Sequence, residues 1–146
     1  MRALLCFLLL ASGDPVGDAM RAYEEGRFAD AVKLFLAAEA EFGEAAPPEL
    51  LHDLALAALR ADDLPLAESS AEKAVVRGGP RFAPQRDFIL GNVAFKRCLK
   101  AEVLASRVES GPIALEAAIL HAETAADSWR RAAISRADWP EARRNV

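Results

Sequence analysis

A repeat of 36 residues, marked by small side chains, is the feature that most constrains how this chain can fold. Small residues recur at this period in two series: Ala19, Ala55 and Gly91, and Ala22, Ala58 and Ala94. A methyl group or a hydrogen lets a neighbouring helix approach closely, and a period in the thirties is typical of stacked helix pairs. We therefore predict an all-α chain, built as an α-solenoid of about three antiparallel hairpins.

The stretch 22–38 shows one such hairpin most clearly. Gly26 interrupts a helical segment, because glycine readily adopts the left-handed backbone angles that end a helix. The four residues that follow at spacings of three and four, and so share one helix face, are Phe28, Ala31, Phe35 and Ala38.

Prolines and capping residues predict where the helices begin. Six prolines precede or open apolar segments, where a missing N–H costs nothing: Pro15, Pro48, Pro65, Pro84, Pro112 and Pro140. Asp14 and Asp63 stand where N-caps are expected. The expected helices cover about 15–25, 28–41, 48–60, 64–77, 84–108 and 112–135, with a further helix starting in 139–146. They pair into hairpins over about 15–41, 48–77 and 84–135.

Composition supports one helical domain with a sizeable core. The chain has 146 residues, of which 53% are hydrophobic, and alanine dominates that fraction. Alanine and leucine favour helix, whereas runs of β-branched residues are nearly absent. The net charge of −4 argues against nucleic acid as a partner.

The first 13 residues have the pattern of a secretory signal peptide. Arg2 precedes an uncharged apolar run over 3–11, and small residues stand at Ala11, where the run ends, and at Gly13. We expect export across the inner membrane of a bacterium, to the periplasm or envelope. A buried first helix is the alternative. Removal of Cys6 would leave Cys98 alone, without an internal disulfide.

The hairpins resemble those of the tetratricopeptide repeat family. The second half of that repeat is matched by Gly26, Phe28, Ala31, Phe35 and Ala38, and, with the aromatics lost, by Asp62, Leu64, Ala67, Ala71 and Ala74. Leu90 and Gly91 match the first half in the third hairpin. The third hairpin departs from the family because about 22 extra residues separate its halves. They either project as a longer hairpin or cover the end of the stack.

The resemblance implies a concave groove lined by the first helix of each hairpin. Transferred position by position, the groove residues are Met20 and Tyr23, then His52, Leu56, Leu59 and Arg60, and then Phe88, Asn92, Phe95 and Lys96. In this family such positions hold a partner protein or peptide. Ordinary packing between hairpins is the alternative for each residue taken singly.

No motif in the chain indicates catalysis, a metal or a cofactor. His52 and His121 belong to different hairpins, and no Cys-x-x-Cys or His-Glu-x-x-His spacing occurs. We therefore expect a non-catalytic scaffold that binds a partner protein. The alternative function is a helical sensor that holds a small ligand or cofactor through His52 and the aromatic groove.

The C-terminal part of the chain is rich in arginine. Its basic residues are Arg130, Arg131, Arg136, Arg143 and Arg144. They fit an acidic partner or peripheral association with an anionic membrane, and a solvated helix face is the alternative.

Overall fold

The computed structural model describes residues 14–107, 111–136, 140 and 144–145, and helices form nearly all of this part of the chain. Six α-helices are present in that part of the chain, and it contains no strand. Their bounds are Pro15–Glu24 (α1), Phe28–Phe42 (α2), Pro48–Arg60 (α3), Leu64–Gly78 (α4), Ala83–Ala105 (α5) and Gly111–Ser135 (α6). Short 3₁₀ turns, Gly43–Ala45 and Pro80–Phe82, precede α3 and α5. The all-α prediction is confirmed.

The predicted helix ends agree with the structure to within three residues. The largest difference is the end of α5, which stops at Ala105 rather than near 108. The predicted signal peptide over 1–13 lies outside the described residues, and so does most of the helix expected in 139–146.

The predicted N-caps of α1 and α4 are confirmed by their hydrogen bonds. The carboxylate of Asp14 accepts the backbone N–H of Val16 at 3.2 Å, and that of Asp63 accepts the N–H of Leu66 at 3.2 Å. Each bond satisfies an N–H that has no partner within the helix. A proline at the first or second helical position accompanies these helices and also α3 and α5.

The turn inside the first hairpin is repeated 36 residues later. Gly26 has φ +75°, and Asp62 has φ +66°, which only Gly, Asn and Asp adopt readily. The residue after Gly26 donates its N–H to the carbonyl of Ala22 at 2.9 Å, and the residue after Asp62 donates to that of Ala58 at 2.9 Å. The same turn therefore closes both hairpins.

The third hairpin lacks this turn because its first helix continues through the equivalent position. Cys98 stands 36 residues after Asp62, and α5 runs on to Ala105 before it ends. Cysteine has no preference for the left-handed region, so nothing ends the helix at this point. The extra residues of the third hairpin consequently lengthen α5 and α6.

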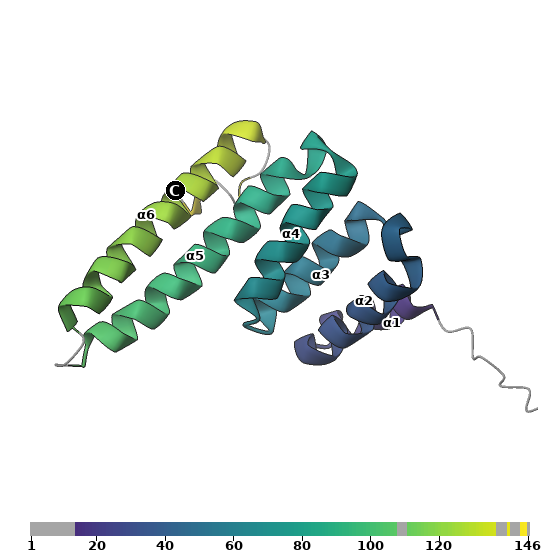
Figure 1. The fold of residues 1–146 in the computed structure, drawn as a ribbon, viewed down its shortest axis with the longest axis horizontal. Helices are drawn as coiled ribbons and strands as arrows, with labels where there is room; N and C mark the ends of the chain where they lie inside the picture. The colour runs from purple at the N-terminus through teal and green to yellow at the C-terminus, as the bar shows by residue number, and fades with distance from the viewer. Residues whose placement is uncertain (1–13, 108–110, 137–139, 141–143, 146) are drawn as a thin grey trace, which may run out of the picture.

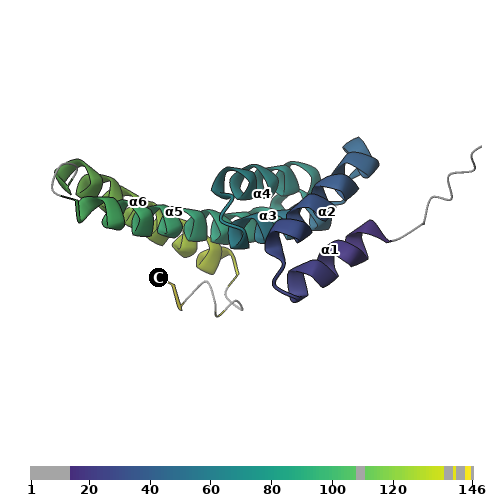
Figure 2. The same cartoon turned by 90° about the horizontal axis from the view of Figure 1, so that it is seen from below.

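Helices that follow one another in the chain pack side by side (Figure 1). The pairs α1–α2, α3–α4 and α5–α6 form hairpins, and α2–α3 and α4–α5 contacts join one hairpin to the next. Both views show α5 and α6 extending past the ends of α3 and α4 (Figures 1 and 2). The longer hairpin therefore projects. We call its outer residues, 99–105 and 111–120, the arm.

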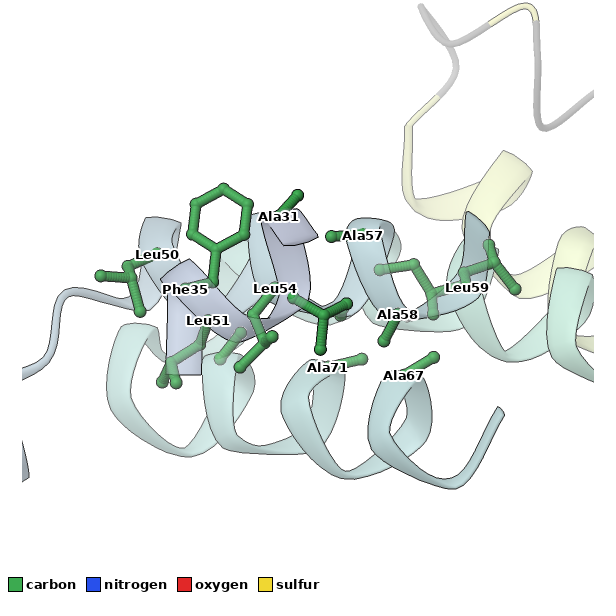
Figure 3. Close-up of a cluster of buried hydrophobic side chains, with 14 of the residues drawn as sticks. Ala31, Phe35, Leu50, Leu51, Leu54, Ala57, Ala58, Leu59, Ala67 and Ala71 are labelled. Carbon is green, nitrogen blue, oxygen red and sulfur yellow. The ribbon is translucent and has the colours of Figure 1, made fainter. Parts of the chain in front are cut away.

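The core lies between α2, α3 and α4 (Figure 3). Phe35, Leu51 and Leu54 are fully buried there, and alanine methyl groups fill the space around them. Both 36-residue series of small residues are buried as well. The small side chains thus face neighbouring helices, as the sequence period predicts.

The third member of one series, Gly91, lies directly against an aromatic ring. A Cβ atom at this position would lie 2.4 Å from Cδ1 of Trp129 and 2.5 Å from its Nε1. Only a hydrogen atom fits between this part of α5 and the indole of α6. The close contact of these two helices therefore requires glycine.

Candidate functional site

An open hollow of about 420 Å³ lies along the first helices of the three hairpins. Its lining consists of Tyr23 from α1, of Leu56, Leu59 and Arg60 from α3, and of Phe88, Asn92, Phe95, Lys96 and Leu99 from α5. Eight of the ten residues predicted for the groove are in this set. The geometry brings them together, and their role in binding stays a prediction.

The other two predicted groove residues lie elsewhere. Met20 lines a smaller cavity of about 70 Å³, next to Tyr23, Phe35 and Leu56. His52 lies against Phe82, with 6.4 Å between the ring centroids, and does not line the hollow. Burial lowers the pKa of His52, so its neutral form is favoured. Met20 thus adjoins the predicted site, and His52 is outside it.

One end of the hollow is fixed by stacking on Phe28. The guanidinium carbon of Arg60 lies 4.6 Å from the centre of the Phe28 ring, and the Tyr23 ring meets the same ring edge-on at 5.4 Å. These contacts hold one groove residue from α1 and one from α3 against α2. The sequence stripe identified Phe28 as a helix-face residue, but it did not indicate this supporting role.

Next to the hollow lies a cluster of charges that sequence reasoning missed. Asp62 Oδ1 lies 3.2 Å from Nζ of Lys96, and Asp62 Oδ2 lies 2.6 Å from Nζ of Lys100. Hydrogen bonds from Lys100 and then from Lys96 lower the pKa of Asp62. Two signals were present in the sequence: the unusual Asp at the glycine position of the turn, and two lysines four residues apart.

A carboxylate in the small cavity next to the hollow is in an environment that disfavours its charge. Asp53 lines the small cavity with Met20 and Tyr23. Burial raises the pKa of Asp53 to about 6, and the nearby charge of Glu49 adds to the effect. The folded chain therefore binds a proton here more tightly than the unfolded chain does.

We expect the Asp53→Asn variant to be about 1 to 2 kcal/mol more stable than the wild type at pH 7, with solvent screening of the partly exposed group taken into account. The contribution of Asp53 to stability is greatest below about pH 4 and is lost as the pH rises through about 6. Urea unfolding between pH 4 and 8 measures the difference. The exposed Glu41→Gln variant is the control, and a D53N variant less stable at pH 7 contradicts the expectation.

In the part of the chain that the structure describes, no three His, Cys, Asp or Glu side chains come together in a way that could hold a metal ion. The thiol of Cys98 is buried between α5 and α6, and burial raises its pKa, which disfavours the reactive thiolate. The hollow itself offers aromatic and aliphatic surface with a few polar groups.

No helix in the described part of the chain is both long enough and apolar enough to cross a bilayer.

Comparison of the chain with family models, with curated proteins and with solved structures finds no match in any of the three.

Proposed function

We propose that this chain is a non-catalytic scaffold of tetratricopeptide-like hairpins, stacked as a small solenoid, which holds a segment of a partner protein. The observation that carries the proposal is the hollow, because residues from the first helix of all three hairpins converge on it. The identical turns at Gly26 and Asp62 support a repeating unit.

The hollow suits a protein segment because its surface combines apolar area with fixed polar groups. Leu56, Phe88 and Phe95 offer the kind of surface on which aromatic or aliphatic anchors of a partner are buried. Asn92 can donate to and accept from a peptide backbone, and Arg60 and Lys96 can meet acidic groups. Since helices supply all of these side chains, the scaffold pays little ordering cost on binding.

The alternative function, a sensor for a small ligand or cofactor, has less support. That function requires His52 to act together with the aromatic groove, but His52 lies against Phe82 instead. Absorbance spectra and metal analysis of the purified chain separate the two functions. A coloured or metal-loaded sample favours the sensor.

The setting of this function is proposed from the first 13 residues alone. Their apolar run supports export, and an exported scaffold would act in assembly or maintenance of the bacterial envelope.

Peptide selection on the purified chain tests the binding function. A displayed library of random 16-residue peptides provides the probes, and fluorescence anisotropy gives the Kd of each selected peptide. We expect the Leu56→Ala, Phe95→Ala double variant to bind selected peptides at least 30-fold more weakly, because it removes two apolar anchors. Circular dichroism confirms that the variant is folded.

The matched control truncates apolar residues that are more exposed than Leu56 and Phe95 and lie outside the hollow. Val76 on α4 and Ile134 on α6 are both exposed, and neither lines it. The Val76→Ala, Ile134→Ala variant should bind the peptides as the wild type does. A selection that yields no peptide, or peptides that both double variants bind equally well, contradicts the proposed groove.

A further inference from the structure

The apolar lining of the hollow does not stop at the end of the hollow but continues along α5. A second hollow, of about 420 Å³, is lined by Leu99, Lys100, Val103 and Leu104. Leu99 belongs to both hollows, so the two are adjacent. Leu99 and Val103 are 44% and 63% exposed and lie next to each other in this hollow, so they form accessible apolar surface. A single apolar surface therefore runs from the three hairpins onto the arm.

The shape of this surface matches a helix rather than an extended strand. Its residues on α5 recur at spacings of three and four, as Phe88, Asn92, Phe95, Leu99 and Val103. They form one stripe about 22 Å long, since a helix rises 1.5 Å per residue. A straight stripe on one helix is complemented by the ridges of a second helix that lies alongside it. About four turns of a partner helix would cover the stripe.

The charges beside the surface are predominantly basic. Three charged side chains line the two hollows, namely Arg60, Lys96 and Lys100. The carboxylate of Asp62 lies between the two lysines and neutralises one positive charge of the pair. The cluster therefore keeps a net positive charge beside an apolar stripe. Acidic residues on a partner would be attracted to it, and basic residues would be repelled.

We propose that the partner segment is an amphipathic helix of about four turns, whose apolar face lies along α5 and whose flanks carry Asp or Glu. This inference rests on the proposed function, and it adds the conformation and the charge of the bound segment. It also gives the projecting arm a role, because the outer half of the partner helix lies on Leu99 and Val103.

Designed peptides test the conformation and the charge together. The probe is a 17-residue peptide with leucines at helical spacing and glutamates on both flanks, and its counterparts carry lysine flanks or the same residues in scrambled order. We expect the acidic amphipathic peptide to bind at least tenfold more tightly than either counterpart. Fluorescence anisotropy in low and high salt measures this, and the preference over the lysine peptide should shrink in high salt.

Two variants of the protein identify the surface used. Leu99→Asn with Val103→Asn removes the apolar stripe from the arm and should weaken the binding of the acidic peptide at least tenfold. The matched control, Leu115→Asn with Ile119→Asn, changes two equally exposed residues of α6 on the same arm and should leave binding unchanged. Lys96→Glu with Lys100→Glu should reverse the preference, so that the lysine peptide becomes the tighter ligand.

The outcomes distinguish this inference from the proposed function. If library peptides still require Leu56 and Phe95 while the arm variant binds them normally, the groove stands and the extended helix is wrong. Equal binding of the acidic and lysine peptides also overturns the inference. Self-association in sedimentation that the Leu99→Asn, Val103→Asn variant abolishes overturns the inference, because a second copy then occupies the stripe. Binding confined to phosphatidylglycerol vesicles and abolished by the same variant also overturns it, because a lipid surface then occupies the stripe.

Discussion

Replacement of Phe35 by alanine should lower the free energy of unfolding by about 3 to 5 kcal/mol. Phe35 is completely buried between α2 and α3, and its neighbours in the core include Leu51 and Leu54. The substitution removes an aromatic ring and leaves a cavity that alanine-rich helices cannot collapse to fill. Urea unfolding followed by circular dichroism measures the loss, and the whole of α1–α3 should become less stable.

The same substitution at the end of the same helix provides the control. Phe42 is 43% exposed, so Phe42→Ala removes an equal ring from a position that is only partly buried. We expect this variant to lose about 1 kcal/mol or less. If both variants lose the same free energy, Phe35 is not the centre of the core.

Replacement of Gly91 by leucine should cost about 3 kcal/mol, although leucine is a much better helix former than glycine. The added Cβ alone would overlap Cδ1 of Trp129 at 2.4 Å, and this indole is buried against α5. The side chain therefore forces α5 and α6 apart. Thermal unfolding followed by circular dichroism measures the stability, and tryptophan fluorescence in a Trp139→Phe background reports the environment of the Trp129 indole.

A second variant separates the steric effect from a general intolerance of change in α5. Asn92→Leu introduces the same side chain one residue later, where it faces the open hollow, and should change stability by less than about 1 kcal/mol. Combining Gly91→Leu with Trp129→Ala should restore part of the loss, because the leucine then occupies the space of the ring. Strictly additive losses in the double variant would contradict the close contact.

The helices could be predicted from sequence because their ends carry local signals. Asp14 and Asp63 cap helices through bonds to residues two or three positions away, and prolines mark the same places. Eight groove residues could be placed together because the resemblance to the tetratricopeptide repeat assigns groove-facing positions, and the 36-residue period relates these positions in one hairpin to those in the next. Apart from that resemblance, these inferences need only distances along the chain.

Features that depend on contacts between hairpins could not be predicted in the same way. The placement of His52 against Phe82, and not in the hollow, depends on how α3 is rotated relative to the turn before α5. The pairing of Asp62 with Lys100 joins residues 38 positions apart and requires α5 to continue past the repeat. The sequence predicts that α5 and α6 are lengthened equally. Whether they project could not be predicted, because the length of a helix carries no information on its direction.

The contacts between consecutive helices have a consequence for how fast the chain folds. The extensive contacts among described residues join helices that follow one another, apart from the contact of α3 with α5. Contacts of this kind close short loops, so little entropy is lost before the first hairpin gains packing energy. Low contact order of this type is associated with folding in microseconds to milliseconds. If the chain is exported as proposed, it would expose its apolar faces only briefly after it leaves the translocation channel.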